Sequence, residues 1–231
     1  MIKLLVFDLD GTLADTGKDL AASVNHAIAQ AGHSPLPLGT VIDFLGDGAR
    51  TLIARSLMAS GDGNASGDEI DGALEAFLEY YRDHCLKDTR LYPGMLEALE
   101  QLPSLRKAVL TNKPDEPARK IIAGLGLAGH FARVVGGDNP FGKKPDPGAL
   151  RQIMETERVS PQETIMIGDG LQDLLVAKRA GAHFLGFLSG LNPGKVLLRE
   201  NPEFVLESMQ ALPRTLAGLQ ERLAATAGGR S

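Results

Sequence analysis

The chain of 231 residues contains no tryptophan and a single cysteine, Cys85. One cysteine cannot form a disulfide within the chain, which is typical of proteins that fold in a reducing compartment. A chain of this length can bury a core large enough to need no disulfide. We interpret Cys85 as a small buried hydrophobic residue, with a catalytic thiol as the less favoured alternative.

Long hydrophobic runs and basic clusters are also lacking. No apolar stretch approaches the length of a bilayer span, and the apolar run before Asp8 is too short for the hydrophobic region of a signal peptide. The formal net charge is −5, and lysines and arginines occur in pairs such as Lys143-Lys144 rather than in runs. Without a basic stripe, a nucleic-acid surface is not expected. The sequence therefore predicts a cytoplasmic protein that binds neither membranes nor nucleic acids.

Short apolar runs and helical patterns alternate after residue 88. Such alternation predicts a parallel sheet with helices on both faces. A first buried strand is predicted at residues 2–7, and a helix closed by Gly181 at 171–180. Further strands are predicted at residues 107–110, 133–135, 164–167, 183–187 and 204–206.

Residues 14–88 interrupt this series, because they carry helical periodicity and no convincing strand. The sequence Thr-Gly-Lys-Asp at 16–19 has the form of a capping box at the start of the first of these helices. The sequence thus predicts an α/β core of residues 1–13 and 89–231, with an α-helical cap of residues 14–88 inserted after the first strand.

Four polar clusters lie beyond the carboxyl ends of predicted strands, which is the edge where open α/β sheets bind ligands. Such a coincidence predicts one shared site. The clusters are Asp8 with Asp10, Thr111-Asn112, Lys143 to Pro147, and Gly168 to Asp173.

The carboxylates of these clusters suit phosphoryl transfer assisted by a metal. Asp8 and Asp10 point the same way and would raise each other's pKa unless a cation held both ionised. Asp8 can attack phosphorus, and Asp10 can protonate the departing oxygen and later deprotonate a water. Asp169 and Asp173 add oxygen ligands, and an all-oxygen set suits Mg²⁺ better than zinc.

The remaining polar residues would neutralise and position a phosphate. Thr111 offers a hydroxyl and Lys144 a positive charge in a loop stiffened by two prolines. Each residue also has a structural interpretation. Thr111 could belong to an ordinary turn, and Lys144 could be a solvated surface lysine. Asp169 could cap the following helix, and Asp173 could be a first-turn charge favoured by the helix dipole.

The motif set resembles that of the haloacid dehalogenase-like phosphatases, in the same order and over the chain to about residue 212. The resemblance implies a Rossmann-like core with a helical cap, a phospho-aspartyl intermediate on Asp8, and Mg²⁺ held by Asp8, the Asp10 carbonyl and Asp169. Gly170 stands where the last motif usually has serine, so we expect altered rather than abolished activity. The motifs are Asp8-Leu9-Asp10-Gly11-Thr12, Thr111, Lys144-Pro145-x-Pro147 and Gly168-Asp169-x-x-x-Asp173.

Within that family the chain is most similar to the phosphoglycolate phosphatases, in which the cap loop is implied to select the leaving group. We expect Gly48 and Asn112 to contact substrate, and we hypothesise that Arg50 meets its carboxylate, with a solvated helix residue as the alternative. The similarity is carried by Asp15-Thr16 with Leu20, by Gly46-Asp47-Gly48-Ala49 and by Gly136-Gly137-Asp138.

The sequence therefore predicts a Mg²⁺-dependent phosphatase, monomeric or homodimeric, for 2-phosphoglycolate or another small phosphorylated metabolite. A β-phosphoglucomutase-like phosphomutase shares the core, but residues 17–19 lack the histidine that such mutases tend to carry. A phosphonate hydrolase would be expected to place a Schiff-base lysine in the cap, where Lys18 is the one candidate. A non-enzymatic phosphate-binding module is disfavoured, because every catalytic residue type is retained.

Overall fold

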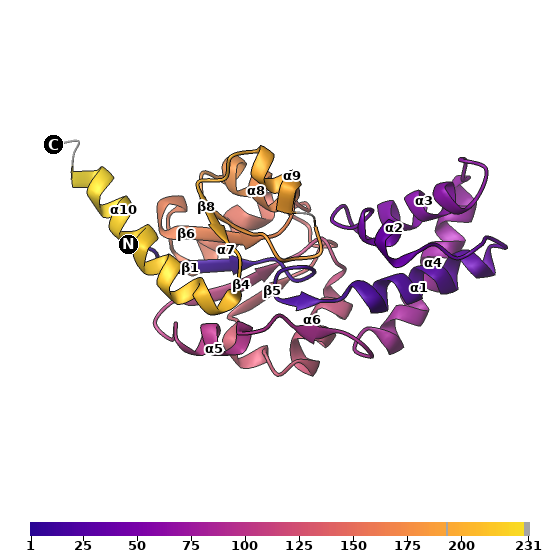
Figure 1. Cartoon of the computed structure of the whole chain (residues 1–231), viewed down its shortest axis with the longest axis horizontal. Helices are drawn as coiled ribbons and strands as arrows, with labels where there is room; N and C mark the ends of the chain where they lie inside the picture. The colour runs from indigo at the N-terminus through magenta and orange to yellow at the C-terminus, as the bar shows by residue number, and fades with distance from the viewer. Residues whose placement is uncertain (193, 229–231) are drawn as a thin grey trace.

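A six-stranded parallel sheet with strand order β5-β4-β1-β6-β7-β8 forms the centre of the molecule (Figure 1). The structure is a computed structural model and describes residues 1–192 and 194–228. The strands are β1 (Leu4–Phe7), β4 (Arg106–Leu110), β5 (Arg133–Val135), β6 (Thr164–Gly168), β7 (His183–Phe187) and β8 (Phe204–Leu206).

Both faces of the sheet are covered by helices, as the sequence predicts. Side chains alternate along β1, so Leu5 and Phe7 enter one hydrophobic cluster while Leu4 and Val6 enter the other. All four are fully buried, which is usual for a central strand of a parallel sheet. The first cluster is packed by α5 (Met95–Glu100), α6 (Asp115–Gly124) and α10 (Leu212–Gly228), and the second by α7 (Gly148–Glu157), α8 (Leu171–Ala180) and α9 (Gly194–Arg199).

The element positions match the sequence-based expectations closely. The strands predicted at 133–135, 183–187 and 204–206 and the helix at 171–180 have the same bounds in the structure. Gly181 follows that helix in the left-handed conformation, with a φ of 77°. Helix α9 was not predicted, because its six residues are too few to show a helical period.

Four helices lie between β2 (Ala14–Asp15) and β3 (Arg90–Leu91) and project to the side opposite α10 (Figure 1). The sequence analysis predicted no strand in residues 14–88, and this prediction was wrong. The strand β2 pairs antiparallel with β3. This short pair holds together the two chain crossings between the helical segment and the sheet. The division at residues 14 and 88 stays a prediction. The helices are α1 (Gly17–Gln30), α2 (Leu38–Ile42), α3 (Ala49–Ser60) and α4 (Gly67–His84).

The expected capping box at the start of α1 is not formed, because its two polar side chains bind elsewhere. The Thr16 hydroxyl donates to Asp10 Oδ1 over 2.6 Å. The Asp19 carboxylate accepts the backbone N–H groups of Asp88 and Thr89 and the Thr89 hydroxyl, at 2.8 to 3.0 Å. Asp19 therefore ties the first turn of α1 to the chain that returns toward the sheet.

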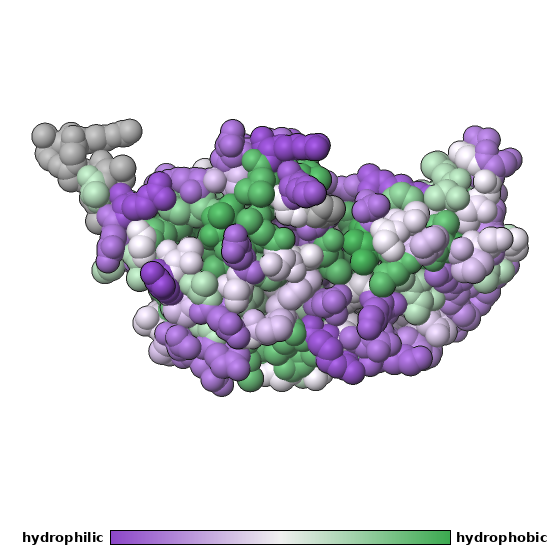
Figure 2. All heavy atoms as spheres, in the orientation of Figure 1, coloured by the Kyte–Doolittle hydropathy of each residue, from purple (hydrophilic) through white to green (hydrophobic). Residues whose placement is uncertain are grey.

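Hydrophilic side chains cover most of the face shown in Figure 2, with hydrophobic patches near α9 and β8. Val196, Leu198 and Val205 are among the exposed hydrophobic residues there. Within the described part of the chain, no helix has both the length and the apolar character needed to cross a membrane.

Replacing Asp19 by alanine is expected to lower the free energy of unfolding by about 2–3 kcal/mol, because it leaves buried N–H groups and a hydroxyl without their charged acceptor. Urea unfolding followed by circular dichroism measures the change. The exposed α4 residue Glu75, replaced by alanine, serves as the control and should change stability by less than about 0.5 kcal/mol. Equal effects of the two substitutions would contradict the structural role of Asp19.

Candidate active site

The register of the sheet brings three of the predicted site residues to one edge. Phe7 at the end of β1 lies level with Val109 of β4 and Ile167 of β6. The residues just beyond these strand ends, Asp8, Thr111 and Asp169, therefore lie side by side. Lys144 reaches the same place from the connection between β5 and α7, and Asp173 from the first turn of α8.

A buried charge cluster forms around Lys144, which is 3% exposed. Its Nζ lies 2.8 Å from Asp8 Oδ1 and 2.6 Å from Asp173 Oδ1. Asp8, Asp169 and Asp173 each present a carboxylate oxygen within 4.8 Å of the others. Lys144 contacts two of these three carboxylates, and its single positive charge leaves an excess of negative charge when all three are ionised. An all-oxygen donor set with that excess fits a hard divalent cation.

The pKa values of the cluster reflect the same excess of negative charge. Burial raises the pKa of Asp8 to about 8, since the Lys144 ammonium that lowers it is offset by the carboxylates of Asp173 and Asp169. Burial and the carboxylate of Asp173 raise the pKa of Asp169 to about 7. Burial alone would lower the pKa of Lys144, but the carboxylates of Asp173 and Asp8 raise it above its usual value. A divalent cation would stabilise the ionised carboxylates.

Asp169 is held on both carboxylate oxygens. Thr12 donates its hydroxyl to Oδ1 at 3.2 Å, while the backbone N–H and side-chain amide of Asn192 donate to Oδ2 at 2.9 and 3.0 Å. Gly11, at a φ of 80°, makes room for this carboxylate, because a Cβ there would lie 2.2 Å from Asp169 Oδ2. Position 11 therefore favours glycine for two reasons, its left-handed φ and the close approach of Asp169.

Gly170 leaves the space that Asn192 occupies. A Cβ at position 170 would lie 3.3 Å from Asn192 Nδ2, which is a tight contact, and 3.4 Å from Asp173 Oδ2, which is close to an ordinary one. The Gly170 N–H donates to Asp173 Oδ2 at 3.0 Å. Asp173 therefore accepts a hydrogen bond at the start of its own helix and also pairs with Lys144, while its role as a metal ligand stays a prediction.

The Asp10 side chain does not join the three-carboxylate cluster. Its Oδ1 accepts the Thr16 hydroxyl and lies 3.1 Å from Lys113 Nζ. The side chain is thereby turned toward the helical segment, whereas Asp8 faces Lys144. The expected metal contact through the Asp10 carbonyl oxygen stays a prediction.

Lys113 is a site residue that the sequence analysis missed. It is 6% exposed, and its Nζ donates to the Tyr81 hydroxyl at 2.8 Å and lies 4.5 Å from the centre of that ring. Its position directly after Thr111 and Asn112, at the end of β4, could have identified it. Asn192 was missed as well, although it follows the end of β7 as the other clusters follow their strands.

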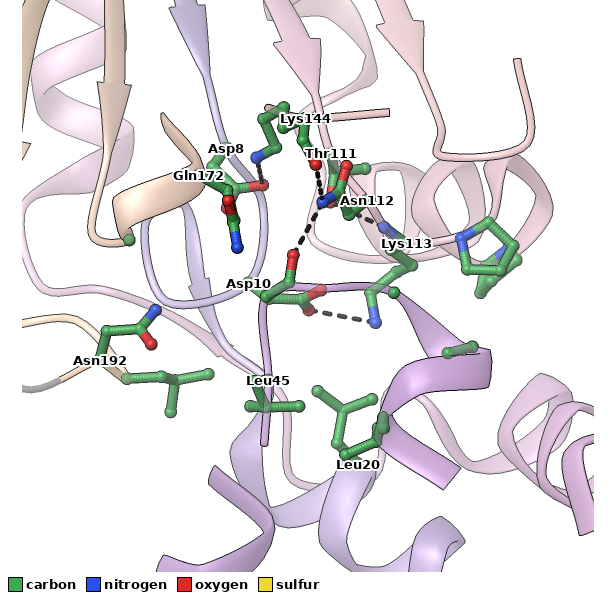
Figure 3. A pocket seen from close by; sticks show the side chains of 18 of the residues that line it. Asp8, Asp10, Leu20, Leu45, Thr111, Asn112, Lys113, Lys144, Gln172 and Asn192 are labelled. Carbon is green, nitrogen blue, oxygen red and sulfur yellow. Dashed lines mark hydrogen bonds and ion pairs between the residues drawn. The ribbon is translucent and has the colours of Figure 1, made fainter. Parts of the chain in front are cut away.

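A pocket lies between this sheet edge and the helical segment (Figure 3). The volume open to the centre of a water-sized sphere is about 60 Å³. On the same measure one water needs roughly 10–15 Å³, so the cavity suits a small ligand. Figure 3 shows Asp8 and Lys144 on one side, Leu20 and Leu45 on the other, and Asp10 between them. Leu52, Phe77 and Leu78 extend the apolar side.

The loop before α3 contacts the sheet edge at several points. Asn112 Nδ2 donates to the carbonyl oxygens of Gly46 and Lys144, both at 2.8 Å. Gln172 donates to the Asp47 carboxylate, and Lys143 donates to the Asp47 carbonyl oxygen. Asn112 Oδ1 is buried and has no hydrogen-bond partner among the described residues, which leaves an acceptor for a ligand or water.

Of the expected substrate contacts, the structure brings Gly48, Asn112 and Thr111 to the pocket. The Thr111 hydroxyl accepts the Lys113 N–H at 3.2 Å, which leaves its own proton to donate. Arg50 is not brought there. Its side chain is 51% exposed and forms an ion pair with Asp71 of α4, because the α3 face that carries it is turned outward. The solvated interpretation of Arg50 is the one that this arrangement supports.

Comparisons with known proteins decide the family. A family model described as haloacid dehalogenase-like hydrolase matches residues 5–187. The chain belongs to this family. The site residues from Asp8 to Asp173 all fall inside the matched range.

Relatives within the family share one name. "Phosphoglycolate phosphatase" of Vibrio parahaemolyticus is 37% identical over 220 residues, which cover 94% of this chain and 96% of the relative. "Phosphoglycolate phosphatase 1" of Pseudomonas aeruginosa is 35% identical over 214 residues, covering 91% and 78%. The crystal structure of a predicted phosphoglycolate phosphatase from Haemophilus somnus superposes with a TM-score of 0.86 at 27% identity, over 92% of this chain and 97% of the other.

Metal affinity is expected to rise with pH and to level off above about 8, since the pKa values of Asp8 and Asp169 are about 8 and 7 without metal. Below these values the metal must displace protons. The unfolded carboxylates titrate near 3.8, so the metal-free fold loses stability as pH rises from about 4 to about 8.

Thermal unfolding with Mg²⁺ and with EDTA, at pH about 5.5 and about 8.5, measures this linkage. The rise in Tm caused by Mg²⁺ should be larger at the higher pH. Replacing Asp169 by asparagine should diminish the Mg²⁺-induced rise in Tm at both pH values. An equal rise at both pH values in the unaltered protein would contradict the described charge cluster.

Proposed function

We propose that the protein is a Mg²⁺-dependent phosphatase that hydrolyses small phosphate monoesters, 2-phosphoglycolate foremost, through a phosphoryl group carried on Asp8. The observation that carries the proposal is the buried cluster of Asp8, Lys144, Asp169 and Asp173, with Asp10 beside it and outside it. Family membership and the names of the relatives support a phosphoric monoester hydrolase.

Asp8 is oriented for attack on phosphorus. Its Oδ1 accepts the Leu9 N–H at 2.7 Å and the Lys144 ammonium at 2.8 Å, and these contacts fix the rotation of the carboxylate. Attack forms a bond from carboxylate oxygen to phosphorus and breaks the bond from phosphorus to the leaving oxygen. Lys144 and the Thr111 hydroxyl then face the negative oxygens of the transferred group.

Asp10 is placed for proton transfer. Its described side-chain contacts, with Thr16 and Lys113, both fall on Oδ1, so Oδ2 is the oxygen left open to transfer a proton during turnover. Asp10 gives this proton to the leaving oxygen in the first step. In the second step it takes a proton from the water that attacks the phosphoryl group on Asp8.

The donor set of the site fits Mg²⁺. Asp8, Asp169 and the Asp10 carbonyl oxygen would hold the ion, with Asp173 beside them. When bound, Mg²⁺ neutralises charge on the phosphate and on the carboxylates around it. Thr12 and Asn192 hold Asp169 in place for this contact.

The pocket favours a small leaving group over a sugar. Leu20, Leu45 and Leu52 on its far side offer no hydrogen-bond partners for sugar hydroxyls. A phosphomutase acting on hexose phosphates is therefore the less favoured function. The monomeric or homodimeric state and the cytoplasmic location stay predictions.

The proposal is tested by phosphate release from a panel of small phosphate esters, with Mg²⁺ and with EDTA. We expect turnover of 2-phosphoglycolate that EDTA abolishes. Replacing Asp8 by asparagine should reduce kcat by about 10³-fold or more, because an amide is a poor nucleophile. The proposal would be overturned if the protein hydrolysed none of the esters in a metal-dependent way. It would also be overturned if the Asp8→Asn variant were as active as the unaltered protein.

A further inference from the structure

The pocket contains a second buried cation, Lys113, that the three-carboxylate cluster does not use. We propose that Lys113 binds the carboxylate of the leaving group and so selects substrates that carry one next to the phosphate. The inference rests on the proposed function, since it takes the phosphate to lie against Asp8. It assigns to Lys113 the part that the sequence had suggested for Arg50.

The position of Lys113 matches the position of the leaving group. Its Nζ lies 3.1 Å from Asp10 Oδ1, so it stands beside the residue that protonates the leaving oxygen. In Figure 3, Asp10 and Lys113 lie between the Asp8–Lys144 pair and the leucines of the apolar side. A single CH₂ group separates the ester oxygen of 2-phosphoglycolate from its carboxyl carbon. The carboxylate therefore comes to rest close to Asp10, within reach of Lys113.

The other cations near the pocket are already paired, which leaves Lys113 as the candidate to bind a substrate carboxylate. Among the described residues that line the pocket, the cationic side chains are Lys113 and Lys144. Lys144 binds both Asp8 and Asp173. Arg50 pairs with Asp71 outside the pocket. Among the described lining residues, Lys113 is thus the cation left for a substrate carboxylate beyond the phosphate position.

The surroundings of Lys113 hold its ammonium group in place and keep water away. The Tyr81 hydroxyl accepts one N–H, and Asp10 faces another. An ammonium group has three N–H donors, so one remains for a ligand. Phe77 and Leu78 line the same side of the pocket. In such apolar surroundings an ion pair with a substrate carboxylate is much stronger than in water.

The test compares two esters that differ in one group: 2-phosphoglycolate, and 2-hydroxyethyl phosphate, in which a neutral CH₂OH replaces the carboxylate. The ratio of their kcat/KM values measures the preference for the carboxylate. Replacing Lys113 by methionine or glutamine should reduce this ratio by roughly 30-fold or more. Replacing Arg50 by methionine is the matched control and should leave the ratio unchanged.

The outcomes separate the inference from the function on which it rests. An equal loss of kcat/KM for both esters would show that Lys113 acts only through Asp10, and would overturn the inference. Loss of the preference in the Arg50→Met variant would overturn it as well. Equal turnover of the two esters by the unaltered protein would show no preference for the carboxylate and would overturn the inference, whereas turnover of neither ester would instead refute the proposed function.

A crystal structure decides the point if neither Lys113 variant folds. The unaltered protein would be crystallised with 3-phosphonopropanoate, in which a CH₂ group replaces the ester oxygen of 2-phosphoglycolate. We expect a carboxylate oxygen within hydrogen-bond distance of Lys113 Nζ. A carboxylate directed to any other residue would overturn the inference.

Discussion

The contact on which the site depends is the buried ion pair of Lys144 with Asp8 and Asp173. One ammonium group balances only part of the charge that Asp8, Asp169 and Asp173 bring together. A fold that buries such an excess is stable only if the carboxylates hold protons or share a cation. The same imbalance accounts for the raised pKa values of Asp8 and Asp169 and for the fit to a divalent metal.

Asp10, the proposed acid/base residue, is linked to the helical segment rather than to this cluster. Asp10 accepts from Thr16 at the start of α1 and faces Lys113, which in turn donates to Tyr81 of α4. The orientation of Asp10 therefore depends on how the helical segment lies against the sheet. Asp47 and Asn112 add contacts between the same two parts. The proposed proton transfer and the proposed substrate choice thus depend on one set of interactions.

The sheet, most helices and the convergence of the central candidate residues could be predicted from the sequence, because open α/β sheets bind ligands at their strand ends and buried strands show clear apolar runs. Asp8, Lys144, Asp169 and Asp173 were found by that rule. Local patterns failed where side chains bind partners distant in sequence. Asp19 bonds to Asp88 and Thr89 instead of forming a capping box, and such a pairing has no local pattern.

Arg50 and Lys113 show the same limit within the site. A helical residue near a glycine-rich loop was expected to reach the substrate, but the rotation of α3 turns Arg50 toward Asp71. Lys113 follows β4, but the position of its ammonium group depends on a hydrogen bond to Tyr81, which is 32 positions away in the sequence. The periodic stripe that contains Tyr81 was interpreted as core packing alone, and its hydroxyl contact adds a role that periodicity does not reveal.

The central claim, that Asp8 carries the phosphoryl group, is tested most directly by trapping that intermediate. The protein turning over 2-phosphoglycolate would be quenched in acid and reduced with borohydride, which converts an aspartyl phosphate to homoserine. Peptide mass spectrometry then locates the homoserine. The account predicts it at position 8. Homoserine at another aspartate, or none at position 8 under conditions of full turnover, would contradict the account.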